Sequence, residues 1–127
     1  MIFPTGRLER EWNSGSLQPL LRVIVKDASE YAADFLDWNF RFTSIYRTPE
    51  ENRKAEAKTA IHTLWRAIDI GAIEVDRSTI QAITDYVNNR WIYDPERPNL
   101  PVCYSAPHGS GPHCHYQVHK NTQRRTT

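Results

Sequence analysis

The longest periodic pattern of hydrophobic and polar positions lies between Leu17 and Leu36. Apolar residues recur there at intervals of three and four, which is the spacing of one face of an α-helix: Leu20, Leu21, Ile24, Val25, Ala28, Tyr31, Ala32 and Phe35. Ser16 precedes the run as a candidate N-cap, and Pro19 is tolerated in a first helical turn. We therefore predict an amphipathic helix over residues 17–36.

Shorter patterns predict two strands and two more helices. Residues 40–47 (FRFTSIYR) and 66–75 (RAIDIGAIEV) alternate and contain aromatic or β-branched residues, which is typical of strands. Residues 48–60 open with Thr48 as N-cap and Pro49 at the first helical position, with acidic residues behind them, which indicates a helix start.

The second half of the chain ends in a predicted hairpin. Residues 76–91 form a helix with one apolar face, made of Ile80, Ile83, Val87 and Trp91. After the proline-rich loop 94–101, VCYSA (102–106) and HCHYQVH (113–119) can pair across the loop PHGSGP. The order of elements predicts one α+β domain with helices packed on a small, mainly antiparallel sheet. Its core spans about residues 17–119, and residues 120–127 are expected to form a flexible tail.

Composition narrows the function classes. The chain has 127 residues, enough for one core, and a net charge of +1, which gives no general attraction for nucleic acids or anionic membranes. The four tryptophans are scattered along the chain, which favours core positions over a base-stacking platform. We thus expect neither nucleic-acid binding nor membrane insertion. Two cysteines, Cys103 and Cys114, favour a reduced pair, with zinc ligation as the second reading because neither belongs to a CxxC pair.

Candidate chemistry gathers near the carboxyl end, where four of the five histidines fall within residues 107–119. On a strand, His113 and His115 project from the same face and Cys114 from the other. His119 shares that face by parity, and His108 lies in the predicted loop. Asp69 stands between two isoleucines of the predicted strand 66–75, so it either faces water or belongs to a site.

Three blocks of sequence resemble the zinc D-alanyl-D-alanine carboxypeptidase and dipeptidase superfamily, whose fold is shared by phage endolysins and the Hedgehog signalling domain. The blocks are TSIYRTPEEN, IHTLWRAIDI and GPHCHYQV, and they span about residues 42–118 in the family's order. The resemblance implies that His62, Asp69 and His115 bind Zn²⁺. It also implies that His113 exchanges protons during catalysis and that Arg47 contacts substrate and stabilises the oxyanion. From the residues alone, Arg47 could instead pair with Glu50 or Glu51 and cap the following helix.

Some positions depart from the family pattern. Ala60 replaces a serine, Trp65 a glycine and Pro112 the glutamate that serves as general base in some branches. Glu74 and Asp76 could support a ligand histidine, although nothing in the sequence singles them out.

The resemblance implies a peptidase that cuts peptidoglycan stem peptides, either at a D-Ala-D-Ala end or at a cross-link. The alternative is a non-catalytic, zinc-stabilised structural or interaction protein, such as a virion component with virion proteins as partners. No signal peptide is recognisable, so we expect synthesis in the cytoplasm and action on the cell wall after release or from a phage particle.

Overall fold

The computed structural model describes residues 1–106 and 111–126 of the chain. The helices among these residues are α1 (Gly6–Trp12), α2 (Pro19–Phe35), α3 (Pro49–Lys54), the 3-10 helix η1 (Ile61–Leu64) and α4 (Arg77–Asn88). The strands are β1 (Arg41–Ser44), β2 (Ala67–Gly71), β3 (Trp91–Ile92), β4 (Cys103–Ala106), β5 (His113–Gln117) and β6 (Gln123–Arg124). None of the helices within the described ranges is both long and apolar enough to cross a membrane.

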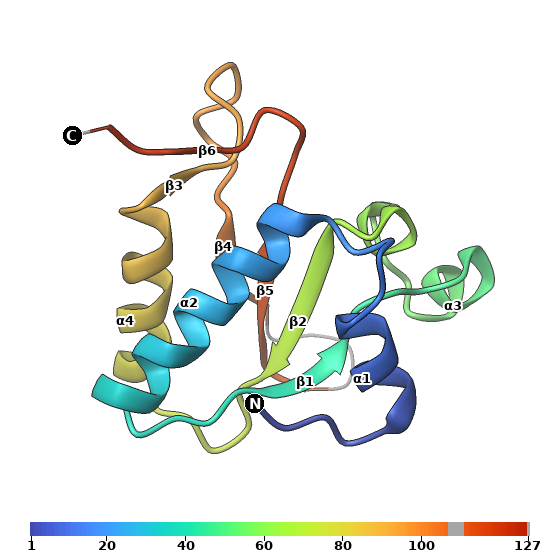
Figure 1. The fold of residues 1–127 in the computed structure, drawn as a ribbon, viewed down its shortest axis with the longest axis horizontal. Coiled ribbons are helices and arrows are strands. Elements are labelled where there is room, and N and C mark those ends of the chain that lie inside the picture. The colour runs from blue at the N-terminus through green and yellow to red at the C-terminus, as the bar shows by residue number, and fades with distance from the viewer. Residues whose placement is uncertain (107–110, 127) are drawn as a thin grey trace.

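The central sheet has the strand order β1-β2-β5-β4, and all of its neighbouring strands are antiparallel (Figure 1). This confirms the predicted α+β class with a small antiparallel sheet. The predicted hairpin is present as β4 and β5, while residues 107–110 of its loop lie outside the described residues. Asp69 on β2 pairs directly with His115 on β5, so the register brings two of the predicted site residues side by side.

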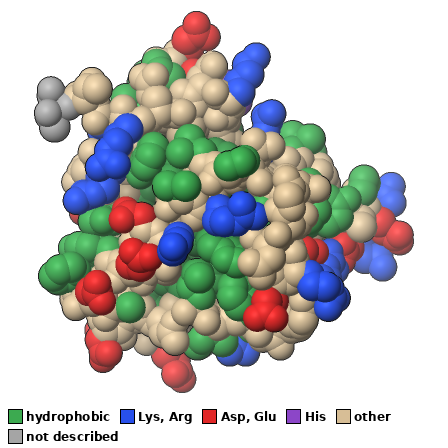
Figure 2. Space-filling model, in the orientation of Figure 1, with side chains coloured by type: hydrophobic (Ala, Val, Ile, Leu, Met, Phe, Trp, Pro, Cys, Tyr) green, Lys and Arg blue, Asp and Glu red, His purple; other side chains and the backbone are tan. Residues whose placement is uncertain are grey.

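Helices α2 and α4 pack together against one face of the sheet, and the core lies between them and the strands (Figure 1). The apolar residues of the strands alternate with polar ones, so Ile68 and Ile70 enter this core and Asp69 points to the other face. Figure 2 shows the α2 side, where charged and apolar side chains mix and no histidine of the described part is visible. Because Asp69 alternates with the core residues Ile68 and Ile70 and pairs with His115, these two predicted site residues lie on the face of the sheet away from α2.

Helix α1 was not predicted from the sequence, because seven residues are too few for a clear period. Its N-cap Thr5 accepts a hydrogen bond from the Leu8 backbone N–H, at 3.2 Å. Trp12 at its end packs on Phe42 of β1, with ring centroids 5.2 Å apart. Through this contact α1 joins the core beside the strand that leads to Arg47.

Two predicted helix boundaries differ from the structure. Helix α2 begins at Pro19, and Gln18 rather than Ser16 is its N-cap, without a side-chain capping bond. The Gln18 N–H donates to the Trp65 carbonyl at 3.2 Å. Helix α3 starts as predicted, with a full capping box between Thr48 and Glu51, but it ends at Lys54 rather than near residue 60. The segment beyond it folds back and reaches the wall of a cleft.

The carboxyl-terminal segment is part of the folded structure through Arg124. Trp91, expected at the end of a helix, lies in β3 and pairs with Arg124 of β6. The Arg124 guanidinium lies 5.6 Å from the centre of the Trp91 ring, and the Arg125 N–H donates to the Arg90 carbonyl at 2.7 Å. The sequence predicted a flexible tail from residue 120 onward; it did not predict β6, because a two-residue strand shows no sequence pattern.

Candidate metal centre

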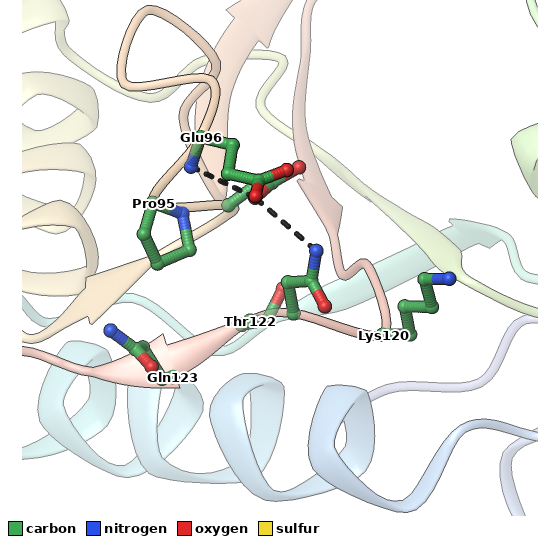
Figure 3. A pocket seen from close by; sticks show the side chains of 7 residues that line it. Pro95, Glu96, Lys120, Thr122 and Gln123 are labelled. Atoms are coloured by element: carbon green, nitrogen blue, oxygen red, sulfur yellow. Dashed lines mark hydrogen bonds between the residues drawn. The ribbon is translucent and has the colours of Figure 1, made fainter.

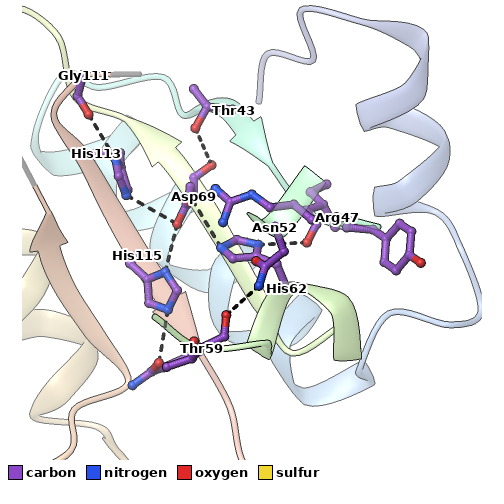
Figure 4. Close-up of polar contacts among 12 residues, drawn as sticks. Thr43, Arg47, Asn52, Thr59, His62, Asp69, Gly111, His113 and His115 are labelled. Atoms are coloured by element: carbon purple, nitrogen blue, oxygen red, sulfur yellow. Dashed lines mark hydrogen bonds and ion pairs between the residues drawn. The ribbon is translucent and has the colours of Figure 1, made fainter. Parts of the chain in front are cut away.

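Three buried side chains from different elements converge on the face of the sheet away from α2 (Figure 4). His62 comes from η1, Asp69 from β2 and His115 from β5, and one potential ligand atom of each lies within 4.8 Å of the others. The Asp69 carboxylate is 3.3 Å from His62 Nε2 and 2.9 Å from His115 Nδ1. Their exposed fractions are 3% for His62 and Asp69 and 6% for His115, so the group is shielded from water.

Backbone contacts fix the position of His62. Its Nδ1–H donates to the Ile45 carbonyl at 3.0 Å, and its own carbonyl accepts from the Arg47 N–H at 3.4 Å. A carbonyl can only accept, so the ring proton is on Nδ1 and the lone pair is on Nε2. That lone pair faces Asp69.

The ring of His115 is oriented in the same way by a side chain. Gln117 donates its amide N–H to the Pro101 carbonyl at 2.8 Å, which leaves its Oε1 as the acceptor 3.1 Å from His115 Nε2. The proton of a neutral His115 is therefore on Nε2, and the Nδ1 lone pair faces Asp69. Sequence reasoning missed Gln117, although its position two residues after His115 on one strand face could have indicated it.

His113 is a third imidazole directed at the same carboxylate. Its Nδ1–H donates to the Gly111 carbonyl at 3.0 Å, and its Nε2 is 3.8 Å from Asp69 Oδ1. Gly111 has a φ of 122°, a conformation that glycine adopts far more readily than other residues. The Nε2 lone pair of His113 is thus aimed into the site from its edge.

These contacts together give an arrangement that could hold a cation. In their neutral forms, the imidazoles of His62, His113 and His115 would each present a lone pair to one carboxylate. An imidazole nitrogen can lie this close to the Asp69 carboxylate only if it carries a second proton or if a cation lies between the two groups. Burial would raise the pKa of Asp69, but when His115 and His62 carry a second proton their hydrogen bonds to the carboxylate outweigh this and hold the pKa well below its usual range. The buried trio His62, Asp69 and His115 can hold a metal ion.

Arg47 also reaches Asp69. Its guanidinium Nη2 lies 3.3 Å from Asp69 Oδ2, and the side chain is 22% exposed. The alternative pairing with Glu50 or Glu51 is not what the structure has, because Glu51 is bonded to Arg7 and Thr48 and Glu50 lies 3.8 Å from Lys54. Arg47 therefore forms one wall of the site.

The site opens into a cleft of about 1090 Å³. Residues of α1, the end of β1, the segment after α3 and the β4–β5 hairpin line it. Tyr104 of β4, which pairs in register with His115, belongs to this lining, and its ring lies 4.7 Å from the His115 ring. Sequence reasoning did not propose Tyr104, although the predicted hairpin places it opposite His115.

The remaining sequence candidates lie elsewhere. Cys103 and Cys114 face the core side of the sheet, and burial raises the pKa of the Cys114 thiol to about 12, so neither is a ligand of this cluster. Glu74 and Asp76 are exposed, and Asp76 precedes α4. His108 falls outside the described residues.

The backbone of Trp65 has a conformation that favours glycine. Its φ is 59°, in the left-handed region, which costs a residue with a side chain about 1–2 kcal/mol. The indole stacks on Tyr46, with ring centroids 4.6 Å apart and planes 15° from parallel. Like Trp12, Trp38 and Trp91, Trp65 packs against the core, as predicted.

A second, smaller hollow of about 450 Å³ lies at Asp94 and the segment from Lys120 to Gln123 (Figure 3). The buried Asp94 carboxylate accepts from the Glu96 N–H at 3.1 Å and from Arg97 Nε at 2.9 Å. His119 lies 3.7 Å from it, but its Nδ1 accepts the Asn121 N–H at 3.2 Å. These contacts join the loop that contains Asp94 to the segment that contains His119. We therefore assign His119 a structural role.

The contact of Gln117 with His115 predicts a measurable effect on metal affinity. If the cluster binds a metal ion, Gln117→Leu removes the acceptor that fixes the His115 ring and should weaken that binding by about 10- to 100-fold, the usual effect of losing such a partner. Gln117→Glu keeps an acceptor and should stay within a few-fold of the wild type, as should the exposed control Gln123→Leu. Competition with a chromophoric chelator measures the three dissociation constants. Equal affinity in Gln117→Leu and the wild type would contradict this role.

Comparisons of the chain with models of known protein families, with curated proteins and with solved structures found no match.

Proposed function

We propose that the cluster of His62, Asp69 and His115 binds Zn²⁺. The observation that carries this proposal is the orientation of the imidazoles, whose outer nitrogens donate to fixed acceptors while their inner lone pairs face a buried carboxylate. Nitrogen and carboxylate ligands suit zinc, and two such ligands about 2.1 Å from a tetrahedral ion lie about 3.4 Å apart. The 3.3 Å between His62 Nε2 and Asp69 Oδ2 is close to that value.

We further propose that the protein is a zinc peptidase acting on peptidoglycan stem peptides. Zinc held by three protein ligands polarises carbonyl groups and lowers the pKa of water. The proposal is supported by the convergence of all three resembling sequence blocks on one cleft, with Arg47, His62, Asp69, His113 and His115 within it. That cleft is large enough for a peptide of several residues.

Two side chains would then do the chemistry beside the ion. His113 presents the Nε2 lone pair at the edge of the cluster and is 12% exposed, so it can accept a proton there and return it to the leaving amine. Arg47 can donate two parallel hydrogen bonds to a carbonyl oxygen as negative charge develops on it, or to a substrate carboxylate. Neither role requires a carboxylate base.

Substitution of His113 tests the peptidase proposal. His113→Gln retains an N–H donor for the Gly111 carbonyl but cannot accept a proton, so turnover of D-Ala-D-Ala or of purified sacculi should fall by about 100-fold. Zinc content should stay at the wild-type level in the same preparation. Loss of zinc from His113→Gln would instead identify His113 as a ligand and overturn its role as the proton acceptor.

A non-catalytic, zinc-stabilised structural protein is the second candidate, and one observation favours it. Pro112 stands where some branches of the resembled family have a glutamate base, and the carboxylates of Glu11 and Glu51 in the cleft are both engaged by Arg7. A wild-type protein that binds zinc but cleaves neither the dipeptide nor sacculi would favour this candidate. In that case virion proteins are the proposed partners.

A further inference from the structure

Arg7 of α1 connects three segments of the chain beside the cleft. Its guanidinium donates to Glu11 Oε2 at 2.7 Å, to both oxygens of Glu51 at 2.7 and 2.9 Å, and to the Tyr46 carbonyl at 2.9 Å. Four acceptors from α1, α3 and the end of β1 therefore share one side chain. An isolated surface ion pair contributes little, but a forked network of this kind fixes geometry.

The network holds the backbone on both sides of Arg47. Glu11 Oε1 accepts the Tyr46 N–H at 3.3 Å, and Arg7 binds the Tyr46 carbonyl. On the other side, Glu51 Oε1 accepts the Thr48 N–H at 2.9 Å. The Glu11 side chain is only 10% exposed, and Arg7 is its ion-pair partner at 2.7 Å. Tyr46 and Thr48 are thus held in place, and the direction of Arg47 between them is set.

Arg7 also removes a competitor for Arg47. Arg47 and Glu51 both line the cleft, so Glu51 is an acidic side chain with which Arg47 could pair. Both oxygens of Glu51 are instead occupied by Arg7, and the hydrogen bonds from Arg7 and the Thr48 N–H hold the pKa of Glu51 at about 2. Arg47 is left to reach Asp69, at 3.3 Å.

We propose that Arg7 is a positioning residue that directs Arg47 into the metal site, and that Glu11 assists it by holding Tyr46. The proposal rests on the proposed function only for its effect on turnover, since the direction of the Arg47 side chain is a property of the fold. Without Arg7, Glu51 becomes available and captures Arg47, which turns away from Asp69.

The direct test follows the Arg47 side chain by NMR. The Nε–Hε signal of Arg47 is assigned by its disappearance in Arg47→Lys. In the wild type it should be a dispersed signal with slow solvent exchange. Arg7→Met should shift it and speed its exchange at least several-fold, while Arg10→Met, an exposed arginine of the same helix, should leave it unchanged. An unshifted, slowly exchanging Arg47 signal in folded Arg7→Met would overturn the proposal.

A double-mutant comparison separates positioning from general stability. If Arg7 acts through Arg47, Arg7→Met should lower kcat/KM about 10-fold in the wild type and have no effect in an Arg47→Ala background. The loss in Tm should be the same in both backgrounds. A 10-fold loss that persists without Arg47 would overturn the proposal.

One more variant and one further outcome distinguish the proposed role of Arg7 from the proposed peptidase activity. Arg7→Lys, which retains the charge, serves if Arg7→Met does not fold, and it should give a smaller shift of the same signal because an ammonium cannot bridge four acceptors. If the wild type cleaves no wall peptide, the peptidase proposal fails while the NMR result still decides the role of Arg7.

Discussion

Purified protein should contain one zinc ion per chain, and His115→Ala should lose most of its zinc affinity. Zinc that binds only the native state at about 1,000 times its dissociation constant stabilises a protein by about 4 kcal/mol. For a domain of this size that corresponds to a rise in Tm of roughly 10 °C or more. Elemental analysis gives the stoichiometry, and thermal unfolding with added zinc or a chelator gives the shift. His115→Ala should show almost no zinc-dependent shift.

His119→Ala is the matched control, because His119 lies shortly after β5 and contacts Asp94 instead of the cluster. It should bind zinc like the wild type. A metal-free wild-type preparation whose Tm does not respond to zinc would contradict the metal site. Equal zinc responses of His115→Ala and His119→Ala would contradict the assignment of His115 as a ligand.

Arg47→Lys should lower kcat/KM by about 10²- to 10³-fold, the scale of losing one preorganised donor at a developing oxyanion. Lysine keeps the charge but cannot offer the forked pair of N–H donors of a guanidinium. In the structure Arg47 lines the cleft and contacts Asp69 rather than the acidic residues of α3. Steady-state kinetics on a D-Ala-D-Ala dipeptide and on stem peptides measure the effect.

Zinc content and Tm are measured on the same Arg47→Lys preparation as a control. Both should stay close to the wild-type values. Arg53→Lys, on the exposed side of α3, should leave kcat/KM unchanged. A rate that stays within two-fold of the wild type in Arg47→Lys would show that this guanidinium contacts no reacting atom.

The elements with strong local patterns could be predicted from sequence, and those made by long-range contacts could not. The helix 17–36 and the start of the helix at Pro49 follow from apolar spacing and from capping residues that act within one turn. Helix α1, η1 and the pair β3–β6 are too short to show a period. They form because they pack on or pair with distant segments, as Trp12 does with Phe42 and Trp91 with Arg124.

The same distinction holds at the site. Strand parity indicated that His113 and His115 share a face, and the structure places His62, Asp69 and His115 together as the resemblance implied. Strand parity could not reveal that the Pro101 carbonyl orients the Gln117 side chain, because these residues are 16 positions apart. It also could not reveal that Arg7 binds the Glu51 carboxylate, 44 positions away. Such contacts depend on how loops and termini pack, which leaves no local trace in the sequence.

The two histidines proposed as ligands differ in how easily a mutation can remove the group that orients them. His62 is oriented by the main-chain carbonyl of Ile45, which remains whatever side chain a codon change introduces there. His115 is oriented by the side chain of Gln117, so a single-nucleotide change at that codon can remove its acceptor. In a random mutagenesis library, loss of metal without loss of a ligand should therefore accumulate at position 117 and not at position 45. The orientation of His62 is therefore insensitive to mutation at position 45, whereas the orientation of His115 depends on a single codon.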